Sequence, residues 1–68
     1  MNPIERILQY FVYSHLPEHL QKISKPCGDL AQEMATVLPS CPETTVGLRK
    51  LLEAKDCFVR ALLDKGNK

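Results

Sequence analysis

Residues 16–38 read LPEHLQKISKPCGDLAQEMATVL, and the spacing of the apolar residues in this stretch indicates the architecture. They are separated alternately by four and three residues, which is typical of a helix that packs along one narrow face. The pattern keeps its phase through Pro26, so it predicts one helix over about 17–38. A proline inside a helix removes a backbone N–H and crowds the preceding turn, so we expect a bend near residue 26. The apolar positions are Leu16, Leu20, Ile23, Cys27, Leu30, Met34 and Val37.

The segment before this stretch also has helical periodicity. Asn2 is a suitable N-cap and Pro3 suits the first helical position. Apolar residues then recur on one helical face as far as Val12. We therefore predict a shorter helix over about 3–14.

The segment after it predicts a third helix. Pro39 and Pro42 interrupt the chain, and the residues beyond them form a wide apolar face, so we expect a helix over about 42–64 that ends at Gly66-Asn67. The short connection makes the two long helices antiparallel. No segment alternates polar and apolar residues with a period of two. The sequence therefore predicts an all-α fold in which residues 1–68 form a single domain, a short N-terminal helix followed by a long antiparallel helical hairpin.

Composition narrows the possible partners and compartment. Nine Lys and Arg residues nearly balance eight Asp and Glu residues, which argues against a nucleic-acid polymer or a membrane surface as partner. No apolar run approaches the roughly 20 residues that cross a bilayer, and we expect no signal peptide. Three cysteines, an odd number, favour free thiols in a reducing cytoplasm. A chain of 68 residues builds only a small core, so we expect assembly into a homo-oligomer.

One motif resembles a catalytic zinc site. His15, Glu18 and His19 match the HxxEH pattern of inverted zinc peptidases. That motif requires both histidines on one uninterrupted helical face, whereas Pro17 is expected to begin a helix between them. No glycine-rich phosphate loop is present, and no Ser, Thr or Cys has an evident general base. The sequence predicts neither an enzyme nor a metal or cofactor site.

Two aromatic residues are candidates for ligand binding. Tyr13 lies opposite the apolar stripe of its own predicted helix, and Tyr10 lies toward the edge of that stripe. An aromatic residue in such a position either packs on the turn or on another subunit, or provides a surface on which a base stacks.

The bent turn near Pro26 is a second candidate. With Gly28 beside it, this turn carries few bulky side chains and would let a ligand approach, while Lys25 or Lys22 supplies positive charge. The alternative is that Lys25 pairs with Asp29, four residues later on the same helix.

Cations on the third helix are further candidates. Lys55 projects from the middle of the apolar face, where a lysine must snorkel, pair with a carboxylate or meet an anion. Arg49 and Arg60 share one flank with Glu53 and Asp56, and opposite charges four residues apart predict a solvated salt-bridge ladder there. Lys55, Arg49 and Arg60 therefore join the candidate ligand-binding residues.

The chain from Phe11 to Leu63 also carries a family resemblance. The run FVYSHLP…LQKISKPCGDLA…LPSCPE…GLRKLLEAKDCFVRALL resembles the hairpin family of small phage anti-defence proteins, the anti-CBASS and anti-Thoeris nucleotide sponges. The matching motifs are an aromatic segment with a histidine and a proline, a Leu-Ala pair, a Pro-Glu turn and a Lys-Leu-x-x-Ala core. In this chain they are residues 11–15 with Pro17, Leu30-Ala31, Pro42-Glu43 and residues 50–54.

The resemblance implies a function. Proteins of this family are obligate homo-oligomers, typically hexamers, which sequester cyclic nucleotide signals in the infected bacterial cytoplasm without cleaving them. Their sites lie between protomers, where an aromatic residue stacks on a base and basic residues hold phosphates. Carried over, the aromatic residue is Tyr13 and the lysine is Lys25, and His15 lies in the same matching region. Tyr10 comes just before that region and remains a candidate from its own position. The alternative is a small helical scaffold or regulatory protein that acts through protein–protein contacts.

Overall fold

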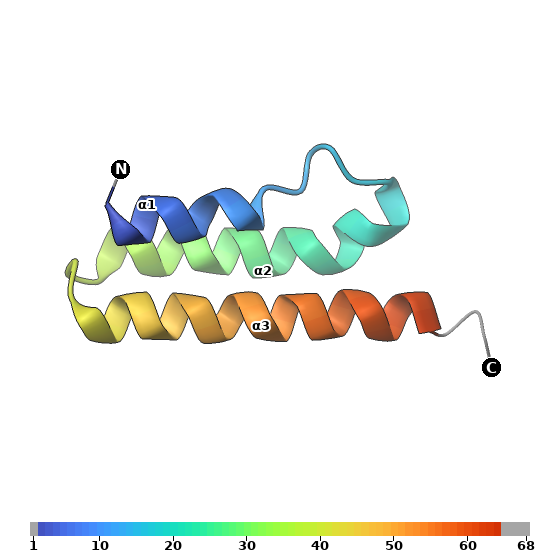
Figure 1. The fold of residues 1–68 in the computed structure, drawn as a ribbon. Helices are drawn as coiled ribbons and strands as arrows, with labels where there is room; N and C mark the ends of the chain where they lie inside the picture. Colours follow the sequence, from blue (N-terminus) through green and yellow to red (C-terminus); the bar gives the residue numbers. More distant parts are fainter. Residues whose placement is uncertain (1, 65–68) are drawn as a thin grey trace.

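The computed structural model of the protein describes residues 2–64 (Figure 1). Its elements are α1 (Pro3–Leu8), the 3-10 helix η1 (Gln9–Phe11), α2 (Glu18–Val37) and α3 (Pro42–Asp64). Within this range no residue belongs to a β-strand. The predicted all-α fold is therefore confirmed, with a short N-terminal helix before two longer helices that run antiparallel in Figure 1.

The first helix begins as the sequence predicts. Asn2 is its N-cap, and the Oδ1 atom of Asn2 accepts a hydrogen bond from the backbone N–H of Glu5 at 2.8 Å. This bond satisfies one of the backbone donors that the first helical turn leaves free. Pro3 follows at the first helical position, where its missing N–H costs no hydrogen bond.

The first helix ends earlier than predicted. The α-helix tightens into η1, and the chain is extended at Val12, with φ −62° and ψ 131°. The predicted range of 3–14 therefore extends three residues past Phe11, where the helical segment ends. The reason is tertiary packing: once the chain leaves the helix, Tyr13 reaches α2, whereas a continued helix would turn that side chain outward.

The second helix has nearly the predicted bounds and continues as one ribbon through Pro26 (Figure 1). Its most buried positions are Ser24, Gly28 and Ala31, which are small residues. The large residues of the predicted seam lie farther out, and Leu30 and Val37 are exposed. Small side chains occupy the centre because α1, η1 and α3 all contact α2, and close approach on several sides leaves no room for larger ones.

The third helix starts at the predicted proline. It extends from Pro42 to Asp64, and the predicted end at Gly66-Asn67 lies outside the described residues. Leu48 is the buried apolar residue of its inner face, while Phe58 and Leu63 are exposed. Over residues 2–64, none of the helices combines the length and the apolar character that a membrane span requires.

The core is small and lies toward one end of the hairpin. Figure 1 shows α1 beside the half of the hairpin next to the α2–α3 turn. At the other end, the start of α2 and the end of α3 enclose an open hollow of about 530 Å³ with mainly apolar walls, including Ile23, Phe58 and Leu62. The buried hydrophobic residues are Ile4, Ile7, Phe11, Ala31 and Leu48.

Candidate functional site

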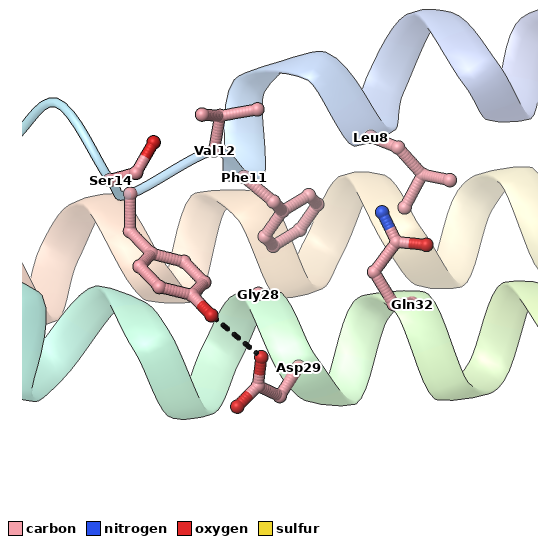
Figure 2. Close-up of a pocket in the computed structure, with 8 residues that line it drawn as sticks. Leu8, Phe11, Val12, Ser14, Gly28, Asp29 and Gln32 are labelled. Atoms are coloured by element: carbon pink, nitrogen blue, oxygen red, sulfur yellow. Dashed lines mark hydrogen bonds between the residues drawn. The ribbon is translucent and has the colours of Figure 1, made fainter.

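A groove of about 330 Å³ lies where the N-terminal segment meets α2 (Figure 2). One wall is formed by η1 and the extended residues after it, and the other by the middle of α2. Figure 2 shows Phe11 pointing from the N-terminal segment toward α2, with Gly28 and Asp29 on the opposite side. The lining residues are Leu8, Phe11, Val12, Tyr13, Ser14, Gly28, Asp29 and Gln32.

Tyr13 packs against α2 of its own chain. Its side chain is half-buried, and a β carbon placed on Gly28 would lie 3.1 Å from the ring atom Cδ2. The ring therefore rests on the one residue of this turn that has no side chain. Of the two alternatives for an aromatic outside its own helical stripe, the structure supports packing within the chain.

The hydroxyl of Tyr13 joins an ionic cluster. It donates a hydrogen bond to Oδ1 of Asp29 at 3.1 Å, the dashed line in Figure 2. It accepts one from Nζ of Lys25 at 3.2 Å, and the same Nζ bonds Oδ2 of Asp29 at 3.0 Å. The Lys25 ammonium also lies 5.3 Å from the centroid of the Tyr13 ring, within the range of a cation–π contact.

The charges of this cluster stabilise one another. Hydrogen bonds to Asp29 and then to Tyr13 raise the pKa of Lys25 above its ordinary value. The hydrogen bond from Lys25 lowers the pKa of Asp29. Both side chains are more than half exposed, at 58% and 55%, so water screens the ion pair and it can exchange for other partners.

Tyr10 differs from Tyr13 in exposure and in its contacts. Its residue is 59% exposed, so its ring is open to solvent. Its backbone carbonyl accepts a hydrogen bond from Nζ of Lys55 at 3.2 Å. A cation at the C-terminal end of a helical segment also meets the negative end of the backbone dipole.

Lys55 is a structural residue in this arrangement. Its side chain is only 15% exposed, and Nζ lies 2.9 Å from Oδ1 of Asp56 as well as near the Tyr10 carbonyl. Of the three alternatives for a lysine on this apolar face, the structure has the one in which it pairs with a carboxylate. Because both contacts are internal, Lys55 is less available to a ligand than Lys25.

The remaining candidates do not gather at the groove. His15 is exposed in the segment between η1 and α2, and Lys22 lines the apolar hollow at the start of α2. Arg60 contacts Sγ of Cys57 at 3.4 Å. Arg49 lines a different hollow, beside α1.

The predicted salt-bridge ladder on α3 is wrong. Among the described residues, Asp56 pairs with its neighbour Lys55, and no ion pair joins Arg49 to Glu53 or Asp56 to Arg60. Spacing of four residues permits such pairs, but an exposed pair gains little over hydration. For Asp56, the ammonium of Lys55 is the nearer partner.

Sequence reasoning did not identify two residues that shape the site. Gln32 lines the groove, and Gln21 holds the connecting segment by donating from Nε2 to the carbonyl of Leu16 at 2.8 Å. Neither residue belongs to a motif. The useful signal for the site was the position of Gly28, which marks a close approach on an otherwise continuous helix.

Comparisons with family models, curated proteins and solved structures found no match to this chain. Within residues 2–64, no three His, Cys, Asp or Glu side chains are grouped to hold a metal ion. The groups available at the groove are one tyrosine, Tyr13, the carboxylate of Asp29 with Lys25 paired to it beside the groove, and an apolar wall.

Proposed function

We propose that the protein binds cyclic nucleotides without cleaving them and so sequesters these signals in an infected bacterial cell. One observation carries the proposal. Lys25 comes 12 positions after Tyr13 in the sequence, and its Nζ atom contacts the hydroxyl of Tyr13 beside the groove. The resemblance of residues 11–63 to nucleotide sponges assigns the same two elements to the ligand.

The groove provides the two kinds of contact that such a ligand needs. A base requires an aromatic face, and the tyrosine ring that lines the groove is that of Tyr13, half-buried against α2. Tyr10 presents a more exposed ring but does not line the groove. A phosphate requires a cation, and Lys25 can turn from Asp29 to a phosphate because the screened ion pair contributes little. Base stacking on an aromatic residue contributes about 1–3 kcal/mol per base.

The proposal includes a homo-oligomer, with a hexamer as the expected form. The support is the half of the hairpin that α1 leaves uncovered, where Phe58 is 54% exposed. Exposed apolar area of this kind is stabilised by a second protein surface. In this proposal the groove is completed by a neighbouring copy, which covers a ligand that one short chain leaves open.

A second candidate function uses the same uncovered end differently. The apolar hollow of about 530 Å³ between the start of α2 and the end of α3 suits an apolar side chain of another protein. In that case the protein is a helical scaffold or regulator, and nucleotides have no effect on it.

A thermal-shift screen separates the two functions. Cyclic dinucleotides, cyclic trinucleotides and cyclic ADP-ribose isomers at micromolar concentration should raise the melting temperature of a sponge by linkage. Lys25→Ala and Tyr13→Ala should each weaken the binding at least about tenfold. Lys50→Ala, which removes an exposed lysine of α3 away from the groove, is the control and should bind normally.

The mass of the ligand after release completes the test. A sponge returns the cyclic nucleotide intact, whereas an enzyme returns a linear product. If no cyclic nucleotide shifts the melting temperature of the assembled protein, the sponge proposal is wrong. A shift that is equal in wild type and Lys25→Ala would contradict the assignment of Lys25.

A further inference from the structure

A second hollow, of about 220 Å³, lies between α1 and α3 on the side of Pro3. Two of its four lining residues are arginines, Arg6 from α1 and Arg49 from α3. The remaining two, Pro3 and Ile7, are apolar. Two cations from different elements therefore share one concave surface, which is distinct from the groove at Tyr13.

Neither arginine has a carboxylate partner within the described part of the chain. The ion pairs of residues 2–64 are Lys25–Asp29 and Lys55–Asp56. Arg49 has Glu53 four residues later on its own helix but does not pair with it. Two like charges that share a hollow repel each other, and an anion between them replaces that repulsion with attraction.

We propose that this hollow binds a phosphate group that carries two negative charges, either inorganic phosphate or a terminal phosphate monoester. Two guanidinium groups supply two positive charges and up to two pairs of parallel N–H donors, which match phosphate oxygens. A phosphate monoester carries between one and a half and two negative charges near pH 7. A cyclic nucleotide has only singly charged diesters, so it fits this hollow less well.

Binding would join the first and third helices. α1 has six residues and is too short to be stable alone, so it depends on its contacts with α2 and α3. A phosphate held by Arg6 and Arg49 adds a polar link between α1 and α3. The inference concerns residues outside the proposed nucleotide groove and does not depend on the proposed function.

The test measures thermal shifts at constant ionic strength with inorganic phosphate, adenosine 5′-monophosphate and a cyclic diadenosine nucleotide. The variants are Arg6→Gln and Arg49→Gln, with Arg60→Gln as the matched control, because Arg60 is the remaining arginine of the chain. We expect a saturable shift with the phosphate or the monophosphate in wild type and in the control. Each of the other variants should weaken this binding at least about tenfold.

The outcomes distinguish specific phosphate binding from a general effect of salt on stability. A shift with inorganic phosphate assigns a free-phosphate site, and a shift with the monophosphate alone assigns a monoester site. A shift that does not saturate and is equal in all variants is an ordinary salt effect and overturns the proposal. Loss of binding in Arg60→Gln as well, or a cyclic nucleotide shift that is lost only in Arg6→Gln and Arg49→Gln, also overturns it.

A second test of the phosphate site is an NMR titration of the wild-type protein, which does not depend on whether a variant folds. Inorganic phosphate should move the side-chain Nε–Hε signals of Arg6 and Arg49 along one saturating curve. The Arg60 signal should stay in place. Equal movement of all three signals would contradict the proposed site.

Discussion

A β carbon at Gly28 would lie 2.8 Å from the carbonyl oxygen of Phe11, so the close contact between α2 and the N-terminal segment requires glycine. The obstacle is a backbone atom of a buried residue, which cannot move aside as a flexible side chain can. The same β carbon would also press on the Tyr13 ring. At Gly47, which lies within α3, the equivalent β carbon would have no atom from another part of the described chain within 4 Å.

These two glycines give opposite predictions. Gly47→Ala should stabilise the protein by about 0.5–1 kcal/mol, since alanine is the better helix former. Gly28→Ala gains the same propensity but forces the N-terminal segment away, so it should destabilise by about 1–3 kcal/mol. Urea unfolding followed by circular dichroism measures both. If the two variants are equally stable, the contact at Phe11 does not constrain the fold.

Lys55→Met should loosen the N-terminal segment. The substitution keeps an unbranched side chain against the apolar face but removes the hydrogen bond to the Tyr10 carbonyl, for an expected loss of about 1–2 kcal/mol. Amide hydrogen exchange should become faster in residues 9–12, whereas the centre of α2 stays protected. Lys50→Met, on the same helix but exposed, is the control. Unchanged exchange in residues 9–12 would contradict the role of Lys55.

Asp29 should titrate below its ordinary pKa of 3.8, because it accepts a hydrogen bond from Lys25. A carboxylate with a lowered pKa stabilises the folded state fully above pH 3.8, and this contribution is lost as the pH falls through the folded-state pKa. Carbon-detected NMR of the carboxyl group gives the midpoint. Lys25→Met should return it toward 3.8, and an unchanged midpoint in this variant would show that the ion pair is not the cause.

Cys41 should alkylate at a lower pH than an ordinary thiol. Its hydrogen bond with the Thr44 hydroxyl, followed by bonds from the backbone N–H groups of Thr44 and Glu43, lowers the pKa of the thiol below 9.0. The thiolate is the reactive form, so the reaction of Cys41 with iodoacetamide should reach its plateau at lower pH. Mass spectrometry compares the pH profile of Cys41 in the wild type and in Thr44→Ala, which lacks the hydroxyl partner. Identical pH profiles of Cys41 in the wild type and in this variant would contradict the prediction.

The helices could be predicted because their signals are local. Ile4 and Ile7 are three residues apart and both face the core, so periodicity alone places them. The end of the first helix at Phe11 could not be predicted this way, because it is set by a contact with Gly28, 17 residues later. The buried stripe of small residues on α2 was missed for a related reason. A hydrophobicity pattern predicts that Leu30 is more buried than Ser24, whereas close packing of α2 against three other elements favours the smaller residue at the buried position.

The candidate site likewise combines contacts that the sequence could predict with contacts that it could not. The Lys25–Asp29 pair follows from a spacing of four residues on one helix and was one of the alternatives read from the sequence. That Tyr13 joins this pair depends on the chain unwinding at Val12, which no local pattern indicates. The contacts of Arg49 show the converse case, in which a favourable spacing with Glu53 produces no ion pair.

The hydrogen bond between Lys55 and Tyr10 also bears on the order in which the chain folds, since 45 residues separate its partners. During synthesis, the segment with α1 and η1 is made before the α3 residues that contact it, Leu48 and Lys55. A six-residue helix does not persist alone, and closing a long loop is slow. The contacts of this segment with α3 should therefore be completed last, whereas its contacts with Gly28 and Asp29 of α2 do not have to wait for α3.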